Sequence, residues 1–383
     1  MRALHGTHSS TKYPGGPPLT LVRPNIHESY PLRIAQVSPL YESVPPKLYG
    51  GTERIVSYLT EELVRQGHDV TLFASGDSET SAHLIPCCTR SLRLDQSCVD
   101  QLAHHIVLVE QVMRAADLFD IIHFHIDYLH FPLSRRQSTP HVTTLHGRLD
   151  LPDLQPVYDE FGDMPVVSIS DAQRAPLPHA NWQATVHHGL PQRLYRPHPR
   201  PGEYLAFLGR MSPEKGIERA IALANRMELP MKVAAKVDVA DRAYFDEVVR
   251  PLLDSPFIEF VGEIGDQQKC DFLGRAIALV MPVDWPEPFG LVMIEAMACG
   301  TPVVAWRRGS VPEIVDDGIT GFIVDDLDQA ADAVHRARHL NRSRIREVFE
   351  RRFSDHRMAT EYVRIYQRLV DAELRHTAVA AVS

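Results

Sequence analysis

The sequence predicts two α/β domains in tandem, each built as a doubly wound parallel sheet. Short apolar segments of strand length alternate with segments whose apolar residues recur at helical spacing, and this alternation runs through most of the chain. A proline-rich stretch near the middle interrupts it. The length of 383 residues is about that of two ordinary domains.

The first expected domain spans residues 31–190 and opens with a βαβ unit. A helix at 53–68 lies between the strands "LRIAQVS" and "DVTLFAS". A second helix is expected at 99–118. The strands that follow read "DIIHFHI", "HVTTLHG", "PVVSIS" and "ATVHHG", and each ends in polar or small residues. Because ligands bind outside the carboxyl ends of strands in such sheets, these endings predict a binding cleft.

Residues 191–202, "PQRLYRPHPRPG", are expected to link the two domains. The second domain spans 203–352, with the strands "YLAFLG", "MKVAAKV", "IEFVG", "ALVMP" and "TPVVAW". Its helices are expected at 215–228, 240–254, 265–275 and 289–299. After "GFIV" the chain is predicted to be mostly helical, and an amphipathic helix at 353–375 is expected to pack back towards the first domain.

The composition excludes several functional classes. Hydrophobic residues make up 44% of the chain and charged residues 23%, as in ordinary soluble globular proteins. The net charge of −9 argues against a dedicated nucleic-acid-binding protein, which carries a basic surface. No apolar run approaches the roughly 18–20 residues that span a bilayer.

The cysteines and the N-terminus favour a cytoplasmic protein. The five cysteines contain no Cys-x-x-Cys pair, which fits a reducing compartment. The N-terminus has no apolar signal segment. Residues 1–30 are rich in Pro, Gly, Ser and His, and we expect them to form a disordered tail.

The expected helix at 289–299 carries a single acid in otherwise apolar surroundings. Apolar residues surround Glu295 on every side of the helix, so the helix is buried, and Gly300 fits the position just after its end. A buried carboxylate without a partner costs several kcal/mol. Two partners remain open for Glu295. One is the ribose of a nucleotide whose phosphate lies at the free N–H groups of 289–292. The other is a core arginine or backbone N–H.

Two further motifs suit a phosphate. In "FLGRMSPEKG", Arg210 and Lys215 flank the turn after a first strand, where two cations would fit a diphosphate. In "YGGTE", Gly50 and Gly51 precede a helix and would let a phosphate or sugar approach the backbone. Each motif by itself is also typical of solvated cations or of a flexible turn.

Taken together and in this order, these motifs resemble glycosyltransferase family 4. The resemblance rests on "YGGTE", "GHDVTLFA", "GRMSPEKG" and "PEPFGLVMIEAMACGTPVVA", and it covers about residues 32–370. It implies the GT-B fold, in which two Rossmann-like doubly wound domains face each other across a cleft. It also implies a retaining enzyme that moves a sugar from a nucleotide-diphosphate-sugar donor to an acceptor hydroxyl. No metal and no other cofactor is expected.

The resemblance assigns roles by matching positions. The groups implied to act in catalysis are Glu287, His146, Arg210 and Lys215. Glu287 would contact hydroxyls of the donor sugar, His146 would lie near the transferred sugar, and the two cations would grip the diphosphate. The remaining donor-binding residues are Gly50, Gly51, Phe289, Gly290, Leu291 and Glu295. Ser170 is implied to line the cleft.

Negative charge grows on the leaving nucleoside diphosphate as the glycosidic bond breaks, so fixed cations and a helix N-terminus are suitable stabilisers. That arrangement can replace a metal, and the sequence has no Asp-x-Asp motif in a position to hold one. The absence of a well-placed nucleophile fits front-face attack, in which the leaving phosphate takes the acceptor proton. This last step is implied by the resemblance.

Two departures leave the donor base and sugar open. Where the family often has Asn-Gly-Val/Ile-Asp, this chain reads "HHGLPQRLY" with His188 and Pro191. Where a strand often ends in Gly, "KVAAKVD" has Lys236, which we expect near the nucleotide. The acceptor also stays open between a sugar, a lipid and another small molecule. Membrane association has little support, because the 99–118 helix is not basic.

Three alternatives have less support. A dinucleotide-dependent oxidoreductase needs Gly-x-Gly-x-x-Gly after a first strand, and neither candidate turn supplies it. A metal site in "HFHIDYLH" would use His123 and His125, which share a strand face, but no third ligand is fixed by the sequence, since Asp127 shares that face and His130 lies beyond it. Structural zinc usually takes four Cys or His ligands. A catalytically silent nucleotide-sugar or glycan-binding protein of the same fold would be favoured by loss of Glu287, Arg210 or Lys215, and all three are present.

Overall fold

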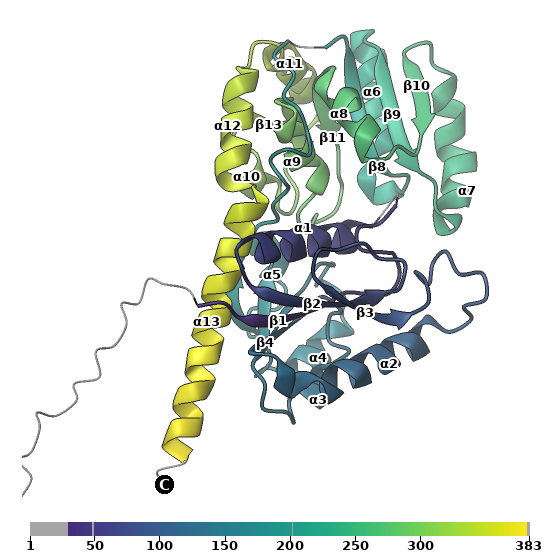
Figure 1. Cartoon of the computed structure of the whole chain (residues 1–383). Coiled ribbons are helices and arrows are strands. Elements are labelled where there is room, and N and C mark those ends of the chain that lie inside the picture. Colours follow the sequence, from purple (N-terminus) through teal and green to yellow (C-terminus); the bar gives the residue numbers. More distant parts are fainter. Residues whose placement is uncertain (1–29, 48–49, 201, 381–383) are drawn as a thin grey trace, which may run out of the picture. The chain divides into compact units, whose positions relative to one another are not determined.

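The computed structural model describes residues 30–47, 50–200 and 202–380. Nearly all of the tail predicted at 1–30 lies outside this part, as does Tyr49 of "YGGTE". The described chain forms two parallel sheets, each flanked by helices (Figure 1). The prediction of two doubly wound α/β sheets is therefore confirmed.

The first sheet, over the described residues, has seven parallel strands in the order β3-β2-β1-β4-β5-β6-β7. The strands are β1 (Arg33–Val37), β2 (Asp69–Ser75), β3 (His83–Cys88), β4 (Ile121–Phe124), β5 (His141–Thr144), β6 (Pro165–Ser168) and β7 (Asn181–Thr185). Its helices are α1 (Gly51–Arg65), α2 (Gln101–Arg114), α3 (Phe131–Ser134), α4 (Leu154–Glu160) and α5 (Asp171–Arg174), with a 3-10 turn at Ala116–Leu118.

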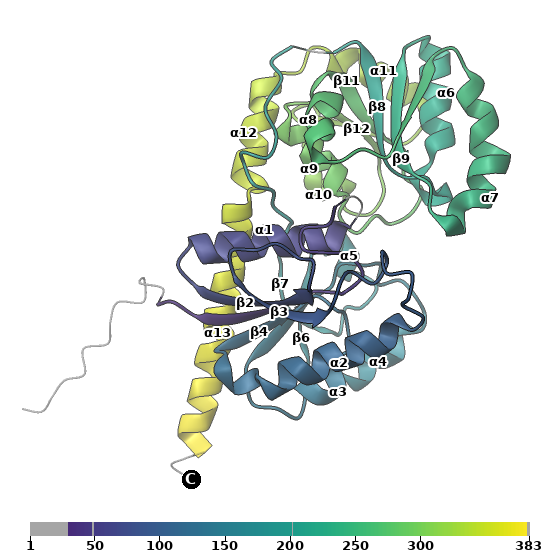
Figure 2. The ribbon, with the colours of Figure 1, turned by 45° about the vertical axis from the view of Figure 1, so that its right-hand side comes forward.

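Alternate residues of β1 face opposite sides of the first sheet, as the pleat requires. Ile34 packs in the cluster that contains Leu59 of α1, and Ala35 packs with Leu108 of α2. Figures 1 and 2 accordingly show α1 on one face and α2 on the other. Burial on both faces explains why these strands read as nearly continuous apolar runs.

The second sheet has six described strands in the order β10-β9-β8-β11-β12-β13, again all parallel. The strands are β8 (Tyr204–Arg210), β9 (Met231–Lys236), β10 (Ile258–Gly262), β11 (Ala276–Met281), β12 (Val303–Trp306) and β13 (Gly321–Val324). The helices are α6 (Ile217–Met227), α8 (Asp266–Gly274), α9 (Leu291–Ala298), α10 (Val311–Ile314), α11 (Leu327–Ala337) and α12 (Arg342–Arg352), with a 3-10 turn at Pro213–Lys215.

Several element predictions differ from the structure. The strand expected at "ATVHHG", residues 184–189, lies earlier in the chain, at Asn181–Thr185. Three other differences have a local reason. The helix expected at 240–254 is present, but its hydrogen-bond pattern changes along its length, from 3-10 at Val239–Asp241 to α at Arg242–Tyr244 (α7), π at Phe245–Val249 and 3-10 at Arg250–Asp254. Pro251 lacks the N–H that a continuous helix needs there. Strand β3 was not predicted because it contains Pro86, which is tolerated since β3 lies at the sheet edge. Helix α9 begins at Leu291 rather than at Phe289, because Gly290 adopts φ 79° at its N-cap.

The last helix, α13 (Asp355–Ala380), connects the second half of the chain to the first sheet. It runs beside that sheet in both views (Figures 1 and 2). The buried hydroxyl of Tyr366 lies 2.7 Å from Nδ1 of His123, and Gln36 donates to it at 3.2 Å. The Tyr362 hydroxyl lies 2.8 Å from Oγ1 of Thr144. These contacts hold the carboxyl ends of the central strands.

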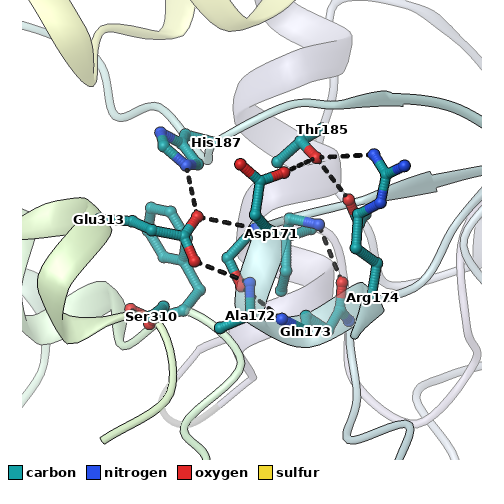
Figure 3. A network of polar contacts seen from close by, with 12 residues as sticks. Asp171, Ala172, Gln173, Arg174, Thr185, His187, Ser310 and Glu313 are labelled. Atoms are coloured by element: carbon teal, nitrogen blue, oxygen red, sulfur yellow. Dashed lines mark hydrogen bonds and ion pairs between the residues drawn. The ribbon is translucent and has the colours of Figure 1, made fainter. Parts of the chain in front are cut away.

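Glu313 of α10 makes a second connection between the two halves (Figure 3). Its carboxylate accepts hydrogen bonds from the backbone N–H groups of Asp171 and Ala172, both at 2.7 Å, and lies 3.3 Å from Nε2 of His187. Burial by itself would raise the pKa of Glu313, but these three hydrogen bonds outweigh burial and hold the pKa below its usual value. The ionised carboxylate therefore stabilises the contact.

Among the described residues, none of the helices combines the length and the apolar character that crossing a membrane requires.

We expect Tyr366→Phe to lower the free energy of unfolding by about 1–3 kcal/mol, because His123 and Gln36 would lose a buried partner. Urea unfolding of the full chain measures this change. Leu374→Ala on the same helix is the control, because Leu374 is 62% exposed. Equal effects of the two substitutions would show that the buried hydroxyl contributes nothing.

We expect Glu313→Gln to destabilise the protein at pH 7 by about 1–2 kcal/mol through the lost charge-assisted hydrogen bonds. Because the folded pKa of Glu313 lies below the unfolded value, this stabilisation is present above the unfolded pKa and is lost as the pH falls through the folded pKa. The difference between the two proteins should therefore shrink in acid. Urea unfolding at pH 7 and in acid measures the difference, and Glu347→Gln, at an exposed position, is the matched control. A difference independent of pH would contradict the assignment.

Candidate active site

A cavity of about 650 Å³ lies where the carboxyl ends of the central strands of both sheets meet. From the first sheet it is lined by segments that follow β1, β4 and β5 and by the start of α1. From the second it is lined by the ends of β8 and β11 and by the segment before α9. Of the residues predicted for the site, those that line the cavity are Gly50, Gly51, His146, Arg210, Lys215, Glu287, Phe289, Gly290, Leu291 and Glu295.

Glycines stand at the N-caps of α1 and α9, the two helices whose first residues line this cavity, and both positions are too crowded for a side chain. A Cβ on Gly50 would lie 2.7 Å from Cβ of Pro46, and one on Gly290 would lie 2.8 Å from Cε of Met281. A Cβ on Gly51 would be 3.6 Å from Cδ1 of Leu291. The first N–H groups of α1 and α9 have no acceptor within their own helices, so both helix ends favour an anion.

Glu295 is 2% exposed and is held by a lysine. Lys269 of α8 donates to its Oε1 at 2.7 Å, and the Tyr195 hydroxyl donates at 3.2 Å. The sequence analysis left an arginine or a backbone N–H open as the protein partner of Glu295, and that prediction is wrong for this oxygen. The second oxygen, Oε2, has no partner among the described residues. The sequence analysis did not single out Lys269; the signal for it was the need of the buried acid for a cation.

The cations of "FLGRMSPEKG" are held by nearby carboxylates. Lys215 forms an ion pair with Glu287, whose Oε2 also accepts from Trp285 Nε1 at 2.9 Å. Arg210 pairs with Glu214 and lies 3.5 Å from Asp241. Lysine and glutamate thus stand together at the end of β8, where a phosphate group would compete with Glu287 for the ammonium.

Lys236 does not line the cavity formed by the described residues. Its ammonium group lies 3.0 Å from Oδ1 of Asp238. The expectation that Lys236 lies near the nucleotide stays a prediction.

His146 is a neutral imidazole. Its Nε2 lies 2.9 Å from Nδ1 of His125, its ring stacks on His188 at 5.4 Å, and its Nδ1 has no partner among the described residues. Desolvation by burial lowers the pKa of His146 to about 3. At neutral pH the side chain therefore offers a hydrogen-bonding nitrogen rather than a positive charge.

His123 and His125 are engaged on both ring nitrogens. His123 lies 2.7 Å from the hydroxyls of Tyr366 and of Thr144, and His125 lies 2.8 Å from Oε1 of Gln36 and 2.9 Å from His146. Among the described residues, no group of three His, Cys, Asp or Glu side chains is arranged to hold a metal ion. Within "HFHIDYLH", His123 and His125 therefore belong to a hydrogen-bond network that supports His146.

Ser170 does not line the cavity, which corrects the sequence-based expectation. Its buried hydroxyl donates to the carbonyl of Pro288 at 2.6 Å and accepts from the N–H of Gln173 at 3.0 Å. Ser170 thus caps α5 and connects it to the segment that precedes α9. Its position supports the site without facing it.

Two protein-family models match the chain. The model described as "Glycosyltransferase Family 4" matches residues 49–209, and that described as "Glycosyl transferases group 1" matches residues 196–352. A D-inositol 3-phosphate glycosyltransferase of Streptomyces scabiei is 36% identical over 155 residues, which cover 37% of this chain and 33% of that protein. The chain thus spans about a third of the length of this relative. An alpha-maltose-1-phosphate synthase of Mycolicibacterium smegmatis is 26% identical over 343 residues, covering 76% and 84% of the two chains.

Solved structures share the fold along nearly their whole length. AviGT4, a glycosyltransferase involved in avilamycin A biosynthesis, superposes with a TM-score of 0.68 at 24% identity, covering 89% of this chain and 98% of its own. Sucrose-phosphate synthase from Thermosynechococcus elongatus has a TM-score of 0.73 at 21% identity, covering 89% and 99%. The fold is therefore the predicted GT-B fold. With consecutive family models over both sheets, from residue 49 to residue 352, the chain belongs to glycosyltransferase family 4.

Proposed function

We propose that this protein is a retaining glycosyltransferase that moves a sugar from a nucleotide-diphosphate-sugar to an acceptor hydroxyl without a metal ion. One observation carries the proposal. Glu295 lines the cavity, its Oε1 is neutralised by Lys269, and its Oε2 has no partner among the described residues. A buried carboxylate oxygen in this position is suited to accept hydrogen bonds from ribose hydroxyls.

Solved relatives of the same fold support a nucleotide-sugar donor. Anabaena Alr3699/HepE is in complex with UDP-glucose in one structure and with UDP and glucose in another. The catalytic domain of starch synthase IV from Arabidopsis thaliana is bound to ADP and acarbose. For this chain the candidate bases of the donor nucleotide are uracil and adenine, and guanine is a third base to test.

The diphosphate would bind between Lys215, Arg210 and the N-terminus of α9. Lys215 would move from its ion pair with Glu287 towards the phosphate, which leaves the Glu287 carboxylate free to accept hydroxyls of the donor sugar. Negative charge grows on the leaving diphosphate as the glycosidic bond breaks. Fixed cations and backbone N–H groups stabilise that charge in the way that a metal ion otherwise does.

The chemical step would be a front-face transfer. The bond between the anomeric carbon and the diphosphate oxygen breaks, the acceptor oxygen bonds to the same face of that carbon, and the acceptor proton passes to the departing phosphate oxygen. His146 is neutral and does not supply a charge; its free nitrogen would orient the sugar. The convergence of Arg210, Lys215 and Glu287 on one cavity favours an enzyme over a silent binding protein.

We expect Glu295→Gln to weaken nucleoside diphosphate binding about 10- to 100-fold, because a charge-assisted hydrogen bond to ribose is lost. Calorimetric titration with UDP, GDP and ADP identifies the base on the wild-type protein and then measures the variant. Circular dichroism checks the fold. Glu259→Gln is the matched control, since Glu259 pairs with Lys232 outside the cavity. An unchanged affinity in folded Glu295→Gln would refute the ribose assignment.

We expect sugar transfer to survive a chelator, because fixed cations and not a metal ion stabilise the leaving group. Nucleotide release, measured with and without EDTA, tests this. Strict dependence on added divalent metal would contradict the proposed role of the cations.

We expect Lys215→Met to lower kcat by about 100- to 1000-fold through lost stabilisation of the leaving group. Nucleotide release measures this change. Lys232→Met serves as the control because its ammonium pairs with Glu259.

A further inference from the structure

The turn after β4 carries an acidic side chain that the donor does not use. Asp127 lines the cavity, and no hydrogen bond or ion pair from the described residues satisfies its carboxylate. Its φ is 51°, and among the described non-glycine residues only Glu228 shares a positive φ. A left-handed conformation costs about 1 kcal/mol for most residues, although Asp tolerates it better than most. The turn therefore places a carboxylate at the cavity, in a backbone conformation that costs free energy.

Two tyrosine rings flank this carboxylate on the same wall. Tyr41 is 37% exposed and Tyr128 is 38% exposed, and neither hydroxyl has a partner among the described residues. Tyr41 rests on the His105 ring at 4.7 Å. Both nitrogens of His105 are engaged, one with the N–H of Leu40 and one with the carbonyl of Gln101. His105 is thus a fixed support for Tyr41.

The arginines on this side of the cavity already have carboxylate partners. Arg93 lies 2.9 Å from Oε1 of Glu42, and Arg148 forms two hydrogen bonds with Asp150 at 2.7 and 2.8 Å. The negative charge of Asp127 has no such partner. Asp127 is exposed to the cavity, and partial desolvation by the protein around it raises the pKa of its carboxyl group to about 6.

We propose that Asp127, Tyr41 and Tyr128 form the acceptor subsite and that this subsite takes an uncharged sugar or polyol. The inference rests on the proposed glycosyl transfer. Hydroxyl groups both donate and accept, so they satisfy the carboxylate and the two phenol groups together. A sugar face also packs on the exposed rings.

Two other acceptor classes fit less well. A phosphorylated acceptor would meet the Asp127 carboxylate, and like charges repel. Its phosphate would also have to displace Glu42 or Asp150 in order to pair with Arg93 or Arg148. An ammonium group would pair with Asp127 but can only donate, so it leaves the tyrosine O–H donors without acceptors. The proposed acceptor of this chain thus differs in charge from the phosphorylated substrates or products that the names of some relatives specify.

The test compares acceptor kinetics in four proteins. Asp127→Asn keeps a residue that tolerates positive φ and removes the charge, and Asp127→Gly removes the side chain while relaxing the backbone. Glu228→Asn is the control, because Glu228 has the same φ of 51° outside the cavity. We expect acceptor KM to rise about tenfold or more in both Asp127 variants and to stay unchanged in Glu228→Asn. The KM for the donor should stay unchanged in all four proteins.

The acceptor panel contains methyl glucoside and myo-inositol as neutral probes, glucose 1-phosphate and inositol 3-phosphate as phosphorylated probes, and glucosamine as the amine. We expect turnover with a neutral probe at the highest kcat/KM. A preference for a phosphorylated probe or for glucosamine overturns the inference, and so does failure of every neutral probe. An unchanged acceptor KM in both Asp127 variants overturns it as well.

The two proposals fail in different ways. If no nucleoside diphosphate binds to the wild-type protein in calorimetry, the proposed function falls and this inference falls with it. If a nucleoside diphosphate binds and transfer occurs, but acceptor KM is indifferent to Asp127, only the acceptor subsite is wrong. Tyr128→Ala gives an independent check, because it should raise acceptor KM without changing nucleoside diphosphate affinity.

Discussion

The ion pair between Glu295 and Lys269 is the interaction on which the site depends. Helix α9 is apolar on all sides and could be buried without any charge. Its one acid is tolerated in the core because α8 supplies an ammonium group at 2.7 Å. With one carboxylate oxygen neutralised, the other stays available at the cavity wall, and the N-terminus of the same helix opens into the same cavity.

The opposite wall depends on a different kind of support. His146 is held from below by His125, which contacts Gln36, and Gln36 in turn contacts Tyr366 of the last helix. Desolvation keeps these histidines neutral, so the network orients a ring without placing a positive charge at this wall of the cavity. The last helix therefore affects the site from a distance, through buried hydrogen bonds whose loss would leave polar groups unsatisfied.

Much of the architecture could be read from periodicity, because strands buried on both faces and amphipathic helices leave clear patterns. The exceptions are local. The segment 240–254 is helical as its pattern predicts, but Pro251 removes a backbone donor and the hydrogen bonds change between α, π and 3-10 types along it. Strand β3 has a weak pattern because it carries Pro86, which its position at the sheet edge permits. Ser170 has a residue type common in clefts, yet it serves as a helix cap.

By itself, the sequence determined the alternation of strands and helices and the positions of the glycines before two helices. It also placed Arg210 and Lys215 after a strand, Glu287 in a loop, and Glu295 inside an apolar helix. These are local properties of chain segments. Only the tertiary structure decided which charges meet. It paired Glu295 with Lys269 and Lys215 with Glu287, and it left Asp127 open to the cavity. The physical reason is that the partner of a buried charge comes from another element, and its identity follows from packing rather than from spacing along the chain.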